Sequence, residues 1–165
     1  MTFTTLTPVA ARPEIPAGPP KLNPRQLRTA QAETLDAPRL RYSLLARALF
    51  KSMDLAYGRT RTIVKFTMLE FIARVPYQAW ELFVLRPEWS YRLNADFEDH
   101  AEHEYMAYVA DHPELETQPD PGSYAAQYGQ YGSLADLLRQ IGHDERTHKE
   151  GSLINMHAPR FHDSL

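Results

Sequence analysis

The sequence predicts an all-α protein that folds as a helical bundle. Four segments repeat apolar residues at helical spacing, near residues 40–57, 62–85, 87–111 and 133–151. Proline or glycine punctuates their ends, as helix boundaries commonly require. With 165 residues and 43% apolar content, the chain is long enough for one domain with a single core.

Composition excludes several classes of function. The chain contains no cysteine, which excludes disulfides, zinc–thiolate sites and iron–sulfur clusters. The net charge is −3, and the basic, aromatic pattern of a nucleic-acid-binding module is absent from the sequence. We therefore expect no nucleic-acid partner.

Residues 1–38 are predicted to form a disordered, proline-rich arm ahead of a helical domain over residues 39–165. Seven of the 13 prolines fall in this arm, which has few large apolar residues and no periodicity. It lacks the apolar core of a secretory signal, so no targeting is assigned.

The first predicted helix, Arg39–Tyr57, is amphipathic and ends at Gly58. Apolar side chains gather on one side, and basic residues supply positive charge. This profile fits a helix that lies in a membrane interface, and it fits equally well a helix that covers a protein core. The apolar set is Leu45, Leu49, Phe50 and Met53, and the basic set is Arg39, Arg41, Arg47 and Lys51.

The second predicted helix, Thr62–Leu85, carries four charged residues, which make it a poor transmembrane span. Glu70 falls on its aromatic and aliphatic seam, where a carboxylate is costly unless it is paired or binds a cation. An ion pair with Arg74 is the structural alternative. Pro76 is expected to kink or restart the helix.

The third predicted helix, Pro87–Asp111, places Glu98 on a seam of small and aromatic residues. His100 and His103 form an HxxH pair that could bind metal, although exposed helical histidines usually carry none. The other acids are predicted to form a hydrated face. The seam also contains Asn94, Ala101, Tyr105 and Tyr108, and the hydrated acids are Asp96, Asp99, Glu102 and Glu104.

The fourth predicted helix begins at Ser133, which caps it together with Asp136. One stripe along it changes from apolar residues to metal-ligand types. Glu145 and His148 lie one turn apart on this stripe, and an ExxH pair on a bundle helix is typical of di-iron and di-manganese carboxylate proteins. Ion pairs in a solvated last turn are the alternative. The full stripe is Leu134, Leu138, Ile141, Glu145, His148 and Ser152.

Three segments resemble the alternative oxidase family, including its plastid terminal oxidase branch. They are MLEFIARVPYQAW, PEWSYRLNADFEDHAEHEYMAYV and IGHDERTHKE. The resemblance covers most of residues 57–160. Its motifs are LExxAxVP at Leu69–Pro76, ExxAxxxY at Glu98–Tyr105 and DExxH at Asp144–His148.

This resemblance implies a ferritin-like di-iron bundle at a membrane surface, in a bacterial inner membrane or an organelle. The implied reaction is oxidation of ubiquinol or a related quinol, with reduction of dioxygen to water and no proton pumping. Tyr105 would stand beside the site, and Asp144 would orient a ligand. By similarity, the two irons would be bound by Glu70, Glu98, Glu145 and His148.

The chain departs from the family in one respect. The family has a helix with a further ExxH pair between the helices that correspond to Glu70 and Glu98, and here Trp80–Pro87 connects them directly. Three of the four usual carboxylates and one of two histidines remain. We therefore also consider an inactive family member and a generic ferritin-like iron protein. A homodimer could complete the site, because two chains would double the donors.

Overall fold

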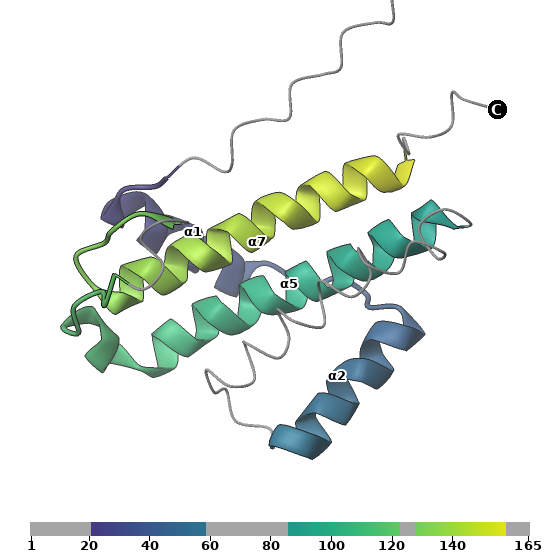
Figure 1. Ribbon diagram of the computed structural model, residues 1–165, viewed down its shortest axis with the longest axis horizontal. Helices are drawn as coiled ribbons and strands as arrows, with labels where there is room; N and C mark the ends of the chain where they lie inside the picture. Colours follow the sequence, from purple (N-terminus) through teal and green to yellow (C-terminus); the bar gives the residue numbers. More distant parts are fainter. Residues whose placement is uncertain (1–20, 59–85, 123–127, 158–165) are drawn as a thin grey trace, which may run out of the picture.

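The computed structural model describes residues 21–58, 86–122 and 128–157, and every regular element in these ranges is a helix. The all-α prediction is confirmed for this part of the chain. Figure 1 shows the arrangement. The elements are α1 (Pro24–Asp36), α2 (Leu44–Tyr57), α5 (Pro87–Asp111), the short 3-10 helix η1 (Pro113–Glu116) and α7 (Leu134–His157).

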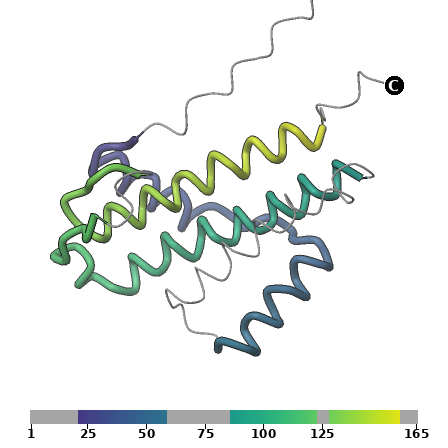
Figure 2. Tube along the Cα trace, viewed as in Figure 1, coloured from purple at the N-terminus to yellow at the C-terminus, as the bar shows by residue number. Residues whose placement is uncertain are grey.

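The two long helices, α5 and α7, lie side by side and run in opposite directions (Figures 1 and 2). Pro87 occupies the first turn of α5, where its missing N–H costs nothing. Ser133 caps α7 through a 3.2 Å hydrogen bond from the Asp136 backbone N–H to Oγ. The predicted helices 87–111 and 133–151 are thus confirmed, and α7 continues to His157.

Gly142 allows α5 and α7 to approach closely. A Cβ at this position would lie 3.1 Å from Met106 Cε and 3.3 Å from Tyr105 Cβ. Around this contact the helices share an apolar cluster, which also takes in Leu115 of η1 and Tyr128, ahead of α7. The cluster is Tyr105, Val109, Leu115, Tyr128, Ala135, Leu137, Leu138 and Ile141.

Helix α1 corrects the prediction of a disordered arm over residues 1–38, which is wrong for Pro24–Asp36. Asn23 and Gln26 form a reciprocal capping box, and Leu27 is fully buried. The helix contacts both α5 and α7. Its sequence shows little apolar periodicity because much of its buried face is polar. Residues 1–20 lie outside the described ranges.

Helix α2 begins at Leu44, capped by Ser43, five residues later than the predicted start at Arg39. The preceding residues bind α5 instead. The backbone N–H of Ser43 donates to Asp96 Oδ2 at 2.7 Å, and that of Leu40 donates to Asp99 Oδ2 at 3.0 Å. The helix ends as predicted at Gly58, whose φ of 79° suits glycine.

One side of α2 packs on the core and the other faces solvent. Phe50 stacks on His100 with ring centroids 4.0 Å apart, and both Phe50 and Met53 are buried against α5. For these two residues the core-covering alternative is correct. The large apolar side chains that α2 exposes share only Leu45 with the predicted set: they are Leu44 (82% exposed), Leu45 (55%), Leu55 (88%) and Tyr57 (40%).

The predicted helix Thr62–Leu85, with Glu70 and Pro76, lies outside the described residues. Among the helices that are described, none combines the length and the apolar character needed to cross a bilayer.

Candidate metal centre

Glu98 is buried where α5 meets α7, with only 6% of its surface exposed. Its Oε1 accepts a hydrogen bond from Asn94 Nδ2 at 2.6 Å, and its Oε2 accepts one from Ser152 Oγ at 3.0 Å. Burial raises the pKa of Glu98 to about 7, although these hydrogen bonds and the charge of Lys149 act to lower it. The carboxylate is therefore shielded from water, and its hydrogen-bond donors among the described residues, Asn94 and Ser152, are neutral.

The Ser152–Glu98 hydrogen bond turns the predicted stripe of α7 toward the seam that holds Glu98. Gly142 touches α5 at Tyr105, and Ser152 touches it at Glu98. Glu145 and His148 precede Ser152 on the same stripe. Their ligand atoms do not form a close group with those of Glu98: in the described part of the chain, the group of three such side chains with ligand atoms within 4.8 Å of one another is Asp99, Glu102 and His103. Glu145 is partly buried. His148 is exposed, yet surrounding atoms remove enough water from its ring to lower the pKa.

The other predicted site residues occupy different surroundings. Tyr105 is 8% exposed and packs in the apolar cluster beside Gly142. Asp144 accepts a 2.6 Å hydrogen bond from Gln140 Nε2, and burial raises its pKa to about 6 while this bond and Lys21 lower it. Glu70 lies outside the described residues.

A second acidic cluster on α5 corrects the prediction of a hydrated face. Asp96, Asp99 and Glu102 are at most 2% exposed, and Glu104 pairs with Arg39 at 2.9 Å. Carboxylate burial on this scale requires partners from other elements. The signal in the sequence that could have revealed this burial is the pair of basic residues on α7, Arg146 and Lys149, which face the acids of α5.

Two cations of α7 neutralise Asp99 and Glu102, while Asp96 pairs with Arg92 of its own helix at 3.1 Å. Lys149 Nζ lies 3.1 Å from Asp99 Oδ1 and 2.6 Å from Glu102 Oε2, and Arg146 Nε donates to Glu102 Oε1 at 2.9 Å. Burial acts to raise the pKa of Glu102, but the hydrogen bonds from Lys149, Thr34 and Arg146 lower it below its usual value. Glu102 thus already has its counter-ions from the protein.

His103 completes a group with Asp99 and Glu102 whose ligand atoms lie within 4.8 Å of one another. Contrary to prediction, His103 is buried, with Nδ1 2.8 Å from the Asp99 carbonyl and Nε2 3.3 Å from that of Ala37. Lys149 occupies the position beside both acids where a metal cation would sit. We therefore interpret this group as an ion-pair network that holds helices together.

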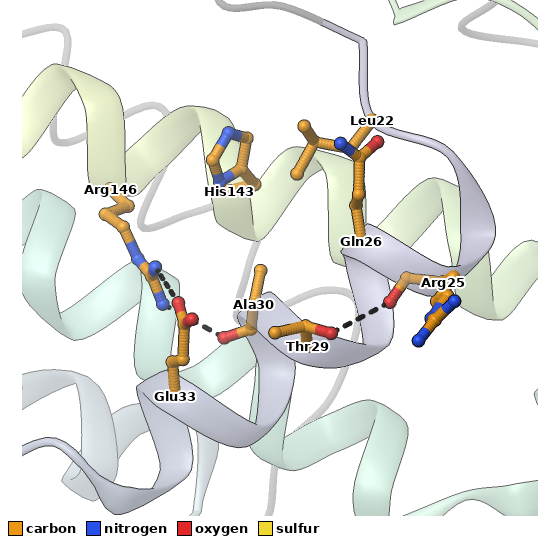
Figure 3. A pocket seen from close by; sticks show the side chains of 8 residues that line it. All are labelled: Leu22, Arg25, Gln26, Thr29, Ala30, Glu33, His143 and Arg146. Carbon is orange, nitrogen blue, oxygen red and sulfur yellow. Dashed lines mark hydrogen bonds and ion pairs between the residues drawn. The ribbon is translucent and has the colours of Figure 1, made fainter.

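Arg146 also binds α1, at the edge of a pocket between α1 and α7 (Figure 3). Its guanidinium pairs with Glu33 at 2.9 Å and donates to the Ala30 carbonyl. His143, on the α7 face turned toward α1, also lines this pocket, and burial followed by the charge of Arg146 lowers its pKa. Glu98, Glu145 and His148 are not among the pocket residues.

The predicted ligands are of types that suit a hard or borderline cation such as iron. Carboxylate oxygens and neutral imidazole are its common protein ligands, and a buried carboxylate without a cationic hydrogen-bond partner is stabilised by a bound cation. In the described residues these predicted ligands are Glu98, Glu145 and His148.

Comparison with known proteins adds no assignment: no protein-family model, no curated protein and no solved structure matches the chain.

Proposed function

We propose that this chain is a quinol:oxygen oxidoreductase of the alternative oxidase type, with two irons bound in a ferritin-like bundle. The observation that supports it best is the burial of the Glu98 carboxylate, which is hydrogen-bonded to Ser152 on the helix that also carries Glu145 and His148. Resemblance adds Glu70 to the ligands.

The proposed reaction oxidises two quinols and reduces one dioxygen to two waters. Each quinol gives up two electrons and two protons, which balances four electrons and four protons per dioxygen. Bound iron would supply the electron transfer to oxygen. Glu98, Glu145 and His148 would hold it, and the buried Tyr105 would stand next to the seam to exchange a proton and an electron.

The site is expected to lose its iron when His148 is replaced by alanine. One nitrogen donor disappears, so iron retained after gel filtration should fall by about tenfold or more. His143→Ala is the matched control, because His143 sits on the same helix but lines the α1 pocket. Equal iron in wild type and both variants, or iron-free wild type, would contradict the metal site.

Quinol-dependent oxygen uptake then separates the candidate activities. Iron with quinol oxidation supports the proposal. Iron that reacts with oxygen but leaves quinol untouched indicates a ferritin-like iron protein, and a chain without iron indicates an inactive relative of the family. These two results are the alternatives that the missing ExxH helix raises.

We further propose that two chains pair to complete the site. Glu98, Glu145 and His148 of one chain offer two carboxylates and one imidazole, about half of a di-iron donor set, and in the shared site Glu70 would have a supporting role. Sedimentation combined with metal analysis should give a dimer with about one iron per chain, and the dimer should weaken in His148→Ala. A monomer, or a dimer indifferent to this change, rules out sharing.

The proposed quinol substrate resides in membranes, so we propose that α2 lies on the membrane surface. Leu44 and Leu55 are exposed, and their spacing of eleven residues puts them on one face with Lys51. Leu44→Glu with Leu55→Glu should reduce partitioning to anionic vesicles by about tenfold or more in flotation. Leu35→Glu, at an exposed site on α1, is the control; unchanged flotation of the α2 variant would exclude this face.

A further inference from the structure

Three buried polar side chains close a hydrogen-bonded triangle at the α5–α7 seam. Asn94 Nδ2 donates to Glu98 Oε1 at 2.6 Å and to Ser152 Oγ at 2.7 Å, and Ser152 Oγ donates to Glu98 Oε2 at 3.0 Å. Asn94 and Ser152 are each 3% exposed. Glu98 is therefore held from its own helix and from α7 at the same time.

We propose that Asn94 and Ser152 are positioning residues, which fix the Glu98 carboxylate for metal binding; this inference rests on the proposed function. Each carboxylate oxygen receives one hydrogen bond in the triangle and has two lone pairs. One lone pair on each oxygen stays available to a metal, while rotation of the carboxylate is blocked.

The neutral character of both donors distinguishes Glu98 from its neighbour Glu102. Lys149 and Arg146 satisfy Glu102 with positive charge, and a metal would have to displace them. Asn94 and Ser152 orient Glu98 without adding positive charge, and among the described residues no ion pair is formed with its carboxylate. The triangle thus restrains the carboxylate and preserves its attraction for a cation.

Ser152 has a second role, because it lies one turn beyond His148 on the α7 stripe. Its contact with Glu98 sets the position of α7 along α5, and so sets where Glu145 and His148 stand relative to Glu98. Partners of this kind, which act through a ligand, typically contribute 10- to 100-fold to metal affinity.

The test titrates the purified full chain with Fe(II) without oxygen and with Co(II), whose visible spectrum reports its coordination. Asn94→Ala and Ser152→Ala should each weaken metal binding by about 10- to 100-fold and alter the Co(II) spectrum. Ser152→Thr keeps the hydroxyl and should restore much of both. Ser90→Ala, a buried serine one turn before Asn94, is the control and should match wild type.

A double-mutant cycle on the metal-free chain tests the contact between Asn94 and Glu98 without relying on metal binding. Asn94→Ala and Glu98→Ala should be non-additive in the unfolding equilibrium constant by several-fold. If wild type binds neither metal, the proposed function fails, and the cycle alone decides whether Asn94 holds Glu98. If wild type binds metal and both alanine variants bind it equally well with an unchanged spectrum, the positioning role is overturned while the function stands.

Discussion

Replacement of Lys149 by methionine is expected to lower the free energy of unfolding by about 3–5 kcal/mol. Its ammonium bridges Asp99 and Glu102, which are 1% and 2% exposed. Methionine fills the space of the aliphatic stem but leaves two buried carboxylates with Arg146 as their remaining cation among these contacts. An unpaired buried charge is costly because it has lost its hydration without compensation.

Urea unfolding of wild type and variant measures this loss, with a chelator present because Asp99, Glu102 and His103 could take up metal once the lysine is gone. Lys51→Met, at an exposed position of α2, is the control and should change stability by less than about 0.5 kcal/mol. In the Lys149 variant, the loss of the cation raises the pKa of a buried carboxyl in the folded state. The variant's loss of unfolding free energy relative to wild type should therefore become smaller as pH falls. A Lys149 variant as stable as the control at neutral pH would contradict the network.

The sequence was sufficient for the long helices because their boundaries are local. Pro87 marks where α5 begins and Pro113 lies just beyond its end, and Ser133 marks where α7 begins. The start of α2 was misplaced because Leu40 and Ser43, which precede the helix, donate their backbone N–H groups to Asp99 and Asp96. These hydrogen bonds depend on a helix more than fifty residues further along the chain, so no local sequence pattern could predict them.

Helix α1 was missed because its docking is polar. Gln31 Nε2 donates to the Met106 carbonyl at 2.8 Å, its Oε1 accepts from Arg139, and Thr34 donates to Glu102 at 2.6 Å. A periodicity of apolar residues cannot reveal a face that is buried through hydrogen bonds. The capping pattern of Asn23, Pro24 and Gln26 was the available local signal.

The candidate site was easier to predict from the sequence than the acidic cluster beside it. A lone carboxylate on an apolar seam, as at Glu98, stands out within one helix. Asp99 and Glu102 lie among other charges, and their burial follows from Arg146 and Lys149 on the opposite helix. Asn94 and Ser152 were placed on the predicted seams, but their shared contact with Glu98 arises only when α5 and α7 pack.

Glu98→Gln is expected to stabilise the metal-free protein by about 1–3 kcal/mol at pH 8 while it abolishes tight iron binding. Burial raises the pKa of Glu98 from the usual 4.5 to about 7. Ionisation therefore costs the folded state up to about 3 kcal/mol, since each pKa unit corresponds to about 1.4 kcal/mol. Glutamine avoids this cost but forms weaker hydrogen bonds, which explains the lower end of the range.

The pH dependence of this gain follows from the sign of the shift. Because the pKa of Glu98 is higher in the folded than in the unfolded state, the folded state binds the proton more tightly. The stability that this protonation gives to the wild type is fully present below about pH 4.5 and is lost as pH rises through about 7. The stability gap between Glu98→Gln and wild type should therefore be small at pH 4.5 and widen toward pH 8. Glu150→Gln, on an exposed position of α7, should show no such gap. A Glu98→Gln chain that is less stable than wild type at pH 8, or that keeps its iron, would show that the carboxylate serves the packing of α5 on α7 rather than a cation.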